Sequence, residues 1–395
     1  MRAGALRGMP RDVIVLSAVA FAVAVGFGVV APALPVFARD FGVGRTAAGA
    51  VISAFAIARL LFALTSGRLV DTYGERTVLA SGIAVVAVSS LFVGLAQNYV
   101  ELLLLRGIGG VGSAMFSVSA YSLLLGSAGP EQRGRASGLF QGAFLLGAIA
   151  GPALGGFVTG INIRAPFFLY AVTLTVAGLI GLLALSRRER PTGDDEADAA
   201  PKPQPVPLAT AFRQPAYRAA LLAALADTWA VLGVRSALVP LFVTEVLHRQ
   251  PLWIGAGFVV VAAVNALVLL PAGRFADDHG RRPVLVAGCT VSAIAVAVLA
   301  MVPDLGGYLL AMAVAGVGSG LLDVAPAAIV GDVAGGRGGR LVAAYQMAGD
   351  TGVILGPVVA GLLADAISFR AAFLVTAAVL GLAAIVGVAS PEYRR

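Results

Sequence analysis

Long apolar stretches separated by short polar segments repeat along the whole chain. A helix that crosses the ~30 Å hydrocarbon core of a bilayer needs about 20 mainly apolar residues. The first stretch follows three arginines, as a signal peptide does, but its apolar run is too long for one, which predicts a retained helix. Twelve stretches are long enough to span a membrane: 13–37, 47–66, 77–96, 99–125, 136–159, 165–186, 217–243, 253–273, 283–302, 306–330, 341–364 and 369–389.

The composition changes which classes of protein remain. Of 395 residues, 59% are hydrophobic and 12% are charged, against about 45–50% and 25% in soluble domains. This excludes a soluble enzyme and a disordered chain. One cysteine and two histidines in separate polar segments predict no disulfide and no metal site. The chain has no phosphate-binding loop of the ATPase type and no recognisable catalytic motif, so we expect neither a cofactor nor enzymatic activity.

The positive net charge of +7 indicates orientation rather than nucleic-acid binding, because the chain has no soluble domain to hold a basic patch. Of the 28 basic residues, 20 lie in segments on the same side as the two termini, 5 lie on the opposite side and three lie inside spans. Basic residues are enriched in cytoplasmic loops. The sequence therefore predicts a multi-pass protein of the plasma membrane with both termini in the cytoplasm and the lipid bilayer as its partner.

One hydrophilic segment, 187–215, divides the spans into six and six. It is rich in charge and proline and has little to bury, so we expect a cytoplasmic tether. A modification or partner site within it is the alternative. The predicted domains are 1–186 and 216–395, each a six-helix bundle, joined by this linker.

The two halves repeat one another. The segment from Gly67 to Arg76 returns at Gly273 to Arg282, an offset of 206 residues, and other pairs keep that offset to within one residue. Six spans per copy give both copies the same orientation in the membrane. The sequence therefore predicts an all-α integral membrane fold of twelve helices, built as two parallel six-helix repeats around a central substrate cavity.

The repeated segment resembles the signature G-x-L-x-D-x-x-G-x-R of the major facilitator superfamily. The first copy matches every fixed position, and the second departs only at Phe275. The resemblance covers nearly the whole chain and implies a transporter that works by alternating access. It also implies that Asp71 latches the cytoplasmic side toward the start of span 11, near 339–341, although a plain solvated hairpin is the alternative. The predicted gate residues are Gly67, Asp71, Gly74, Arg76, Gly273, Asp277, Gly280 and Arg282.

Span 5 contains the pattern G-x-x-x-G-P-x-x-G-G, which is similar to the antiporter signature of drug/proton exporters in that family. The glycines leave a smooth groove for a neighbouring helix, and the proline bends the span. Span 11 holds a weaker version of the pattern. Generic helix packing is the alternative explanation. The residues of the pattern are Gly147, Gly151, Pro152, Gly155 and Gly156.

Span 4 places Arg106, Gly110, Ser113 and Ser117 on one helix face. A polar stripe on an apolar span is expected to face a cavity rather than lipid. The stripe resembles a family motif whose arginine is linked to proton transfer, although Gly109 stands where the family often has glutamine. A structural pair between Arg106 and Glu101 is the alternative.

Acidic residues inside the spans are the candidates for proton coupling. Asp350 and Asp227 lie near the middle of their spans and Asp323 lies closer to the cytoplasmic end of span 10. Asp350 ranks first, because polar and proline residues share its stripe. The alternative is that these acids are paired structurally with Arg59 or Arg235, or with hydroxyls such as that of Thr228. Residues expected to line the substrate cavity are Ser113, Ser117, Tyr121, Gln141, Trp229, Arg235, Asn265, Tyr345, Gln346 and Arg59.

Together these features predict a monomeric secondary transporter that exports lipophilic or amphipathic, drug-like small molecules in exchange for protons. Few fixed charges in a mainly apolar cavity suit such substrates. The alternative is a facilitator-type carrier, including an importer, for sugars, amino acids or other metabolites. A sensor without transport activity is a third possibility.

Overall fold

The computed structural model describes residues 9–127, 132–185, 208–334 and 339–391, and within those ranges every regular element is a helix. The first part of the chain contains α1 (Arg11–Val30), α2 (Ala33–Arg39), α3 (Arg45–Tyr73), α4 (Glu75–Leu95), α5 (Tyr99–Ser127), α6 (Arg133–Ile161) and α7 (Ala165–Ala184). The second part contains α8 (Leu208–Arg213), α9 (Pro215–Thr228), η1 (Trp229–Ser236), α10 (Val239–Leu241), η2 (Phe242–Val246), α11 (Leu252–His279), α12 (Arg281–Met301), α13 (Leu305–Leu322), α14 (Ala325–Ala334), α15 (Gly339–Ala366) and α16 (Phe369–Ala389).

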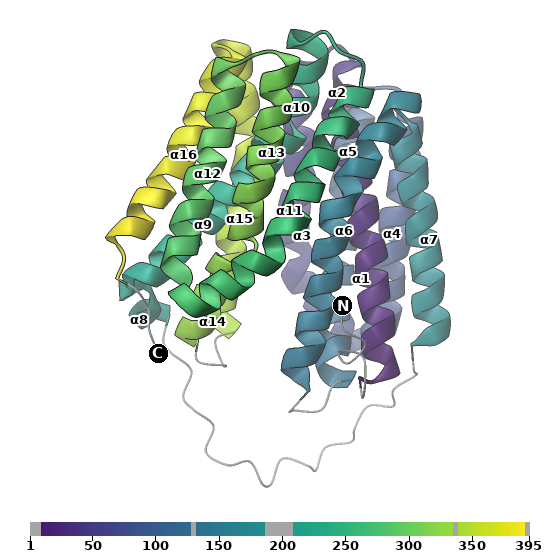
Figure 1. Cartoon of the computed structure of the whole chain (residues 1–395). Helices are drawn as coiled ribbons and strands as arrows, with labels where there is room; N and C mark the ends of the chain where they lie inside the picture. Colours follow the sequence, from purple (N-terminus) through teal and green to yellow (C-terminus); the bar gives the residue numbers. More distant parts are fainter. Residues whose placement is uncertain (1–8, 128–131, 186–207, 335–338, 392–395) are drawn as a thin grey trace.

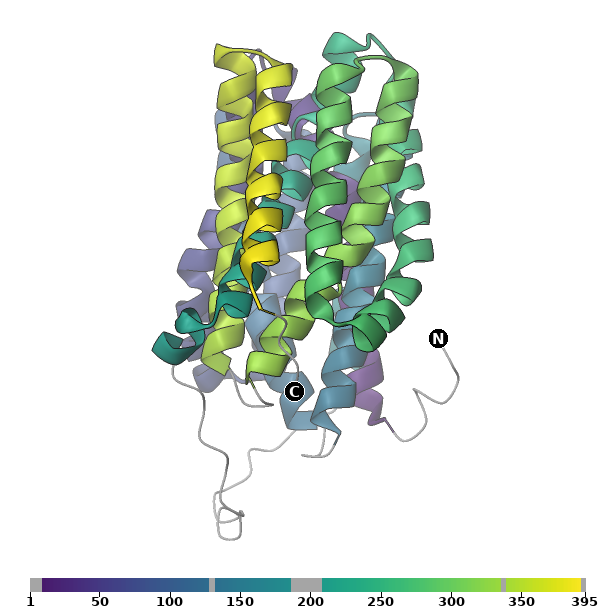
Figure 2. The same cartoon turned by 60° about the vertical axis from the view of Figure 1, so that its left-hand side comes forward.

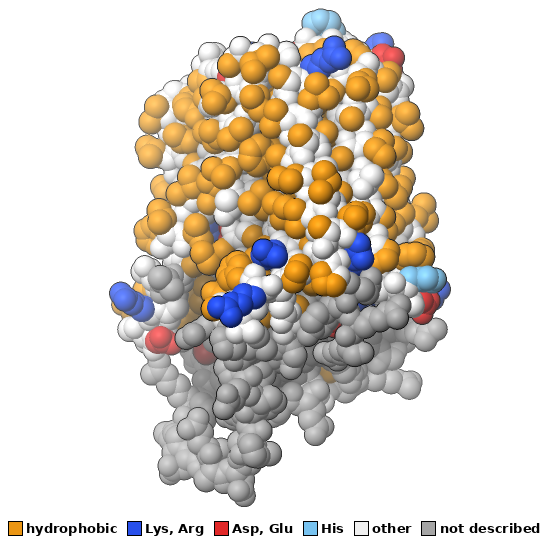
Figure 3. Space-filling view, turned by 90° about the vertical axis from the view of Figure 1, so that its left-hand side faces the viewer, with side chains coloured by type: hydrophobic (Ala, Val, Ile, Leu, Met, Phe, Trp, Pro, Cys, Tyr) orange, Lys and Arg blue, Asp and Glu red, His pale blue; other side chains and the backbone are white. Residues whose placement is uncertain are grey.

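Twelve helical segments of the described chain are long and apolar enough to cross a membrane, which confirms the number predicted from the sequence. Consecutive short helices combine into single spans in three places, Arg11–Arg39, Pro215–Val246 and Leu305–Val333. On the face shown in Figure 3, hydrophobic side chains cover the middle of the molecule, and charged side chains lie toward its two ends. An apolar middle with charged ends matches the profile of a bilayer.

The segments predicted as hairpin loops are mostly helical, which corrects the sequence interpretation. Helix α3 continues to Tyr73 and α4 begins at Glu75, so Gly74 alone makes the reversal, with φ of 81°. Gly280 does the same between α11 and α12, with φ of 98°. A residue without a Cβ adopts positive φ at no steric cost. The polar residues of both motifs therefore extend the helices past the apolar spans.

The end of the predicted linker is also helical. Residues 208–213 form α8, in which Ala211 is fully buried. The ring of Phe212 packs edge-on against Tyr217 of α9, with 5.7 Å between ring centroids. Residues 186–207, the greater part of the predicted linker, lie outside the described residues. The prediction that 208–215 has little to bury is therefore wrong for α8.

The helices form two groups, α1–α7 and α8–α16, that lie side by side (Figures 1 and 2). We call the end of the bundle where α1 begins and α16 ends the terminal face, and the opposite end the far face. Two seams join the groups, α3 against α15 and α6 against α11. Glycines permit the close approach: a Cβ on Gly156 would lie 2.1 Å from the Cα of Gly255, and one on Gly49 would lie 2.2 Å from the carbonyl oxygen of Pro357.

The two groups diverge toward the terminal face. In Figure 1, α11 and α6 lie close together near the far face and move apart below it. Gly138 and Gly142, in the terminal-face half of α6, have no described atom within 4 Å of an added Cβ. The seam between α6 and α11 is therefore closed at the far face and open at the terminal face.

Candidate functional site

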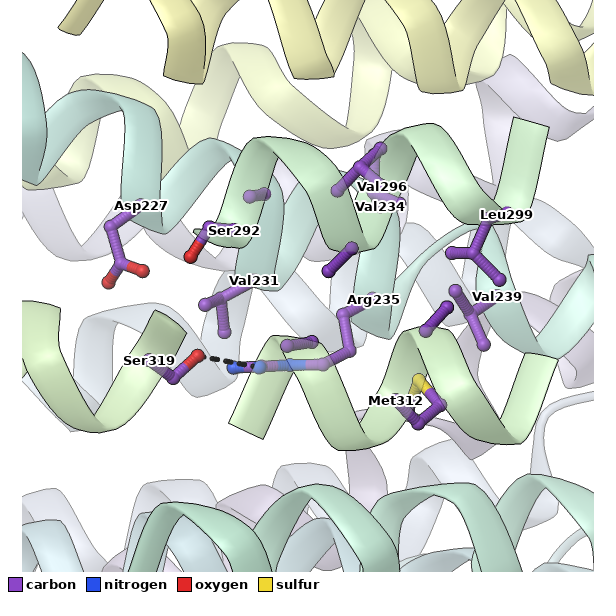
Figure 4. A pocket seen from close by; sticks show the side chains of 14 residues that line it. Asp227, Val231, Val234, Arg235, Val239, Ser292, Val296, Leu299, Met312 and Ser319 are labelled. Carbon is purple, nitrogen blue, oxygen red and sulfur yellow. Dashed lines mark hydrogen bonds between the residues drawn. The ribbon is translucent and has the colours of Figure 1, made fainter. Parts of the chain in front are cut away.

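A small pocket, with about 30 Å³ of space for water, lies inside the second group of helices, between η1, α12 and α13 (Figure 4). Four polar side chains line it: Asp227, Arg235, Ser292 and Ser319. Its other walls are Ala, Val, Leu and Met side chains. The pocket is a polar site within an apolar span region, and in membrane proteins such sites are usually functional.

Arg235 is the cation of this pocket. Its Nη1 donates a hydrogen bond of 2.8 Å to Ser319 Oγ, and it interacts electrostatically with both Asp227 and Asp323. It lies on η1, a π-helical segment that runs from Trp229 to Ser236. π-helical turns are rare and occur often at functional sites. Irregular backbone at membrane depth is tolerated where it lines a cavity, and η1 does so here.

Asp323 ends α13 and lies beside the pocket rather than in its wall. Asn265 Nδ2 of α11 donates a 2.9 Å hydrogen bond to Asp323 Oδ2. Asn265 is 4% exposed, and its Oδ1 has no hydrogen-bond partner among the described residues. The structure thus brings together four residues that the sequence singled out separately. We call Asp227, Arg235, Asn265 and Asp323 the acid cluster.

Asp350 lies apart from the acid cluster. Its carboxylate forms an ion pair with Arg59, which joins α15 to α3 across one of the two seams. This is the structural pairing that the sequence left open as an alternative. Near it, Thr228 Oγ1 of α9 donates a 2.8 Å hydrogen bond to the carbonyl oxygen of Gly349.

Arg106 does not face an open cavity, which corrects the prediction for span 4. It is 3% exposed, and its guanidinium lies over the ring of Phe55 on α3, with 4.4 Å from Cζ to the ring centroid. Such a cation–π contact accounts for a buried guanidinium that has no carboxylate beside it among the described residues. The alternative pairing with Glu101 is not what the structure shows, because that carboxylate accepts hydrogen bonds from Gln97 N and Asn98 Nδ2.

Trp229 also differs from its prediction as a cavity residue. It is buried, and its Nε1 donates a 3.1 Å hydrogen bond to Thr376 Oγ1 of α16. A buried indole N–H needs such an acceptor, and here the acceptor lies on the outer helix α16. Trp229 therefore fastens η1 to α16.

The remaining cavity candidates lie on α5, α6 and α15. Ser117 Oγ donates to the carbonyl oxygen of Ser113 within α5, at 2.9 Å. The ring of Tyr121 packs on Phe140, with 5.3 Å between centroids. Tyr345 is half-buried, and the two glutamines of this set, Gln141 and Gln346, are exposed. Their place in a substrate cavity stays a prediction.

Among the gate-motif residues, Arg282 contacts the end of α16. Arg282 donates from Nε to the carbonyl oxygen of Gly387, at 3.2 Å, and also bonds the carbonyl of Val388, so it caps the end of α16. Asp71 is exposed. The side chains of Asp277 and of residues 339–340 lie outside the described set, so the latch stays a prediction.

The span 5 glycines pack against α1. A Cβ on Gly147, Gly151 or Gly155 would lie 2.6, 2.5 or 2.1 Å from a carbonyl oxygen of α1. In the second group, Gly352 and Gly356 face α9 and η1 in the same manner. The pattern therefore sets the distance between helices within each group, and Gly156 extends it to the seam with α11.

A charge cluster at the far face escaped the sequence interpretation. Glu245 of η2 forms ion pairs with Arg39, at 2.8 Å, and with Arg45, at 2.7 Å. Arg45 also lies 3.6 Å from Asp365 of α15. We call these four residues the far-face charge cluster. The sequence analysis counted the two arginines only as markers of topology. The signal that could have revealed the cluster is that the arginines lie in the first half of the chain, whereas both acids lie in the second half.

We expect Glu245→Gln to loosen the far face. The variant keeps the size of the side chain but leaves two arginines without their shared carboxylate, and partly exposed ion pairs contribute up to about 1 kcal/mol each. A cysteine at Ser53, whose Oγ donates to the carbonyl oxygen of Ile354 in the seam, should then react faster with a maleimide in a Cys289→Ser background. Arg164→Gln, which removes a contact within the first group, is the control. An unchanged rate would contradict the role of the cluster.

Comparison with known proteins adds a family and named relatives. The family model described as Major Facilitator Superfamily matches residues 16–264 and 220–393. The chain is 26% identical over 343 residues to "Multidrug resistance protein 1" of Bacillus subtilis (strain 168), covering 86% of each chain. It is 28% identical over 176 residues to "Quinolone resistance protein NorA" of Staphylococcus aureus (strain Mu50 / ATCC 700699), covering 45% of this chain and 44% of that relative.

Solved structures show the same fold. A bacterial homolog to the human lysosomal transporter Spinster, in an inward-facing and occupied conformation, superposes with a TM-score of 0.77 at 15% identity over 95% of each chain. The nucleoside transporter NupG superposes with a TM-score of 0.71 at 14% identity, over 96% of this chain and 99% of that one. At such identities the likeness concerns the fold alone.

Proposed function

Because this chain belongs to the major facilitator superfamily and is a multi-pass membrane transporter rather than an enzyme, we propose that it exports lipophilic or amphipathic small molecules in exchange for protons. The observation on which the proposal rests is the acid cluster, with two carboxylates beside one guanidinium in the second group of helices. The names of the two relatives, which concern resistance to several drugs and to quinolones, support the substrate class.

The direction of access follows from the orientation that the basic residues favour. We place the terminal face in the cytoplasm, so the conformation described here is open toward the cytoplasm and closed at the external face. The far-face charge cluster and the Gly156–Gly255 contact hold it closed. A transported molecule then enters between the two groups of helices, and the seams separate to release it outside.

The charges of the acid cluster supply the coupling. Asp227 and Asp323 together hold two negative charges when ionised, and Arg235 balances one of them. One proton makes the cluster neutral, and its release restores a net charge of −1. An uncompensated charge at membrane depth is costly, so occupancy by a proton changes which arrangement of α9, η1 and α13 is favoured. This is the differential interaction that a ligand needs to shift a conformational equilibrium.

Transport assays in proteoliposomes test the proposal. A panel of lipophilic cations and antibiotics, run beside sugars, amino acids and nucleosides, should show movement of the lipophilic compounds when a pH gradient is imposed. A protonophore that dissipates the gradient should stop it. Transport of a polar metabolite that persists after the gradient has collapsed would contradict the proposal and favour the facilitator alternative.

A further inference from the structure

The pocket of the second helix group extends from the acid cluster toward the far face. Its polar side chains gather at one end, and Figure 4 shows Asp227, Ser292 and Ser319 at that end. Toward the other end lies Leu299, two residues before α12 ends at Met301. Helix α12 begins at the terminal face, so its last turn is at the far face.

We propose that this pocket is a water-holding route by which protons from the far face reach Asp227, separate from the path of the transported molecule. The inference rests on the proposed function and adds a path for the proton. It also gives the two acids different roles. Asp227 lines the pocket and receives the proton, whereas Asp323 lies outside its wall and is held by Asn265.

The polar end of the pocket meets the requirements of bound water. A water molecule in a protein needs two to four polar partners, and its share of liquid volume is about 30 Å³. The pocket has about 30 Å³ of space for water, and a carboxylate, a guanidinium and two hydroxyls line one end. Water there can donate to Asp227 and accept from Arg235, which is the arrangement needed to pass a proton.

The backbone along the pocket supports the same interpretation. Ala230, Val231, Val234 and Arg235, all on η1, form one wall. A π-helical segment widens the helix and disturbs its regular hydrogen bonds. At membrane depth such backbone is found where it is buried in protein or lines a water-filled space. The irregular segment therefore coincides with the wall along which we place water.

The end near the far face is an apolar plug formed by Val239, Leu299 and Met312, each at most 5% exposed. An apolar constriction interrupts a water column by dewetting. Protons therefore cannot pass freely in the conformation described here, and the plug keeps the proton gradient from leaking. A small displacement of α12 against α13 would open it.

The charged and titratable groups around Asp227 come from several elements. Arg235 lies on its own span, Asp323 at the end of α13, Tyr345 on α15 and Cys289 on α12. Arg235 is the cation among them. A proton that arrives through the pocket meets Asp227 first, because neither Asp323, Tyr345 nor Cys289 lines the pocket. The route is also separate in space, since α12 and α13 take no part in the seams between the groups.

Filling the pocket tests the route. Ala295 lines it and is 1% exposed, so Ala295→Leu should displace water beside Asp227. We expect the variant to lose transport driven by a pH gradient while it retains counterflow, the exchange of labelled for unlabelled substrate without a gradient. The matched control is Ala287→Leu, the same substitution at an exposed position of the same helix. A filled variant with wild-type gradient-driven transport would overturn the route.

A second variant opens the plug. It tests the route even if Ala295→Leu loses both gradient-driven transport and counterflow. Leu299→Ala should let protons cross without substrate, so a pH gradient imposed on proteoliposomes collapses faster than with the wild type. An unchanged leak overturns the route. Failure of the proposed function gives a different result: transport by the wild-type protein would then not respond to a pH gradient.

Discussion

Replacing Asp227 by asparagine is expected to abolish transport driven by a pH gradient and to leave counterflow intact. Asparagine has the size of aspartate but does not bind a proton at the pH of the assay. In the variant the charges of Arg235 and Asp323 therefore cancel permanently, and the acid cluster stays neutral. The substrate path between the two helix groups is untouched, because Asp227 lies on α9 at the pocket within the second group. Proteoliposomes loaded with substrate give both rates from one preparation.

Asp350→Asn is the comparison that makes this result specific. Asp350 pairs with Arg59 across the α3–α15 seam, so its loss leaves a guanidinium unpaired at membrane depth in every cycle. We expect that variant to slow counterflow and gradient-driven transport together. Gradient-driven transport that survives in Asp227→Asn would show that the acid cluster does not couple protons to the substrate.

Gly156→Val is expected to prevent closure of the far face. The new Cβ would lie 2.1 Å from the Cα of Gly255 and 2.3 Å from its nitrogen, and both are backbone atoms that cannot turn away. Overpacking of this kind costs about 1–3 kcal/mol, which corresponds to a shift of about five- to 150-fold in the conformational equilibrium. Spin labels at Asn162 and Gln250, beside the far-face ends of α6 and α11, should therefore move apart.

The control for this prediction is Gly107→Val on α5, where an added Cβ meets no described atom within 4 Å. It carries the same loss of a helical glycine without the clash. Transport should be lost in Gly156→Val and retained in the control. A label distance that does not change in Gly156→Val would mean that the α6–α11 contact yields locally and does not set the conformation.

The sequence predicted the spans because a bilayer imposes a length and a composition that can be read along the chain. It also located the reversals at Gly74 and Gly280, although not the helices that reach them. Polar residues at 67–73 looked like a loop, yet helix α3 continues through them. Apolar periodicity marks where a helix leaves the lipid, and the backbone hydrogen bonds continue beyond that point.

The site could be predicted only by residue type. Ionisable residues in apolar spans are conspicuous, so Asp227, Asp323 and Arg235 were found, but no local pattern showed that they meet. The sequence ranked Asp350 first, whereas its pairing with Arg59 depends on two positions 291 residues apart. The far-face charge cluster could not be predicted for the same reason, because Arg45 and Asp365 are 320 residues apart and meet only in the folded chain.

The acid cluster lies in one half of a duplicated chain, and this has an evolutionary consequence. At the offset of 206 residues, the positions equivalent to Asp227 and Asp323 in the first copy are Phe21 and Ser117. Ser319, which binds Arg235, still has its twin in Ser113. A symmetric ancestor would hold both sets of charges or neither. The two copies have therefore diverged at these positions, and under the proposed function the second half alone contains the proton-binding acid cluster.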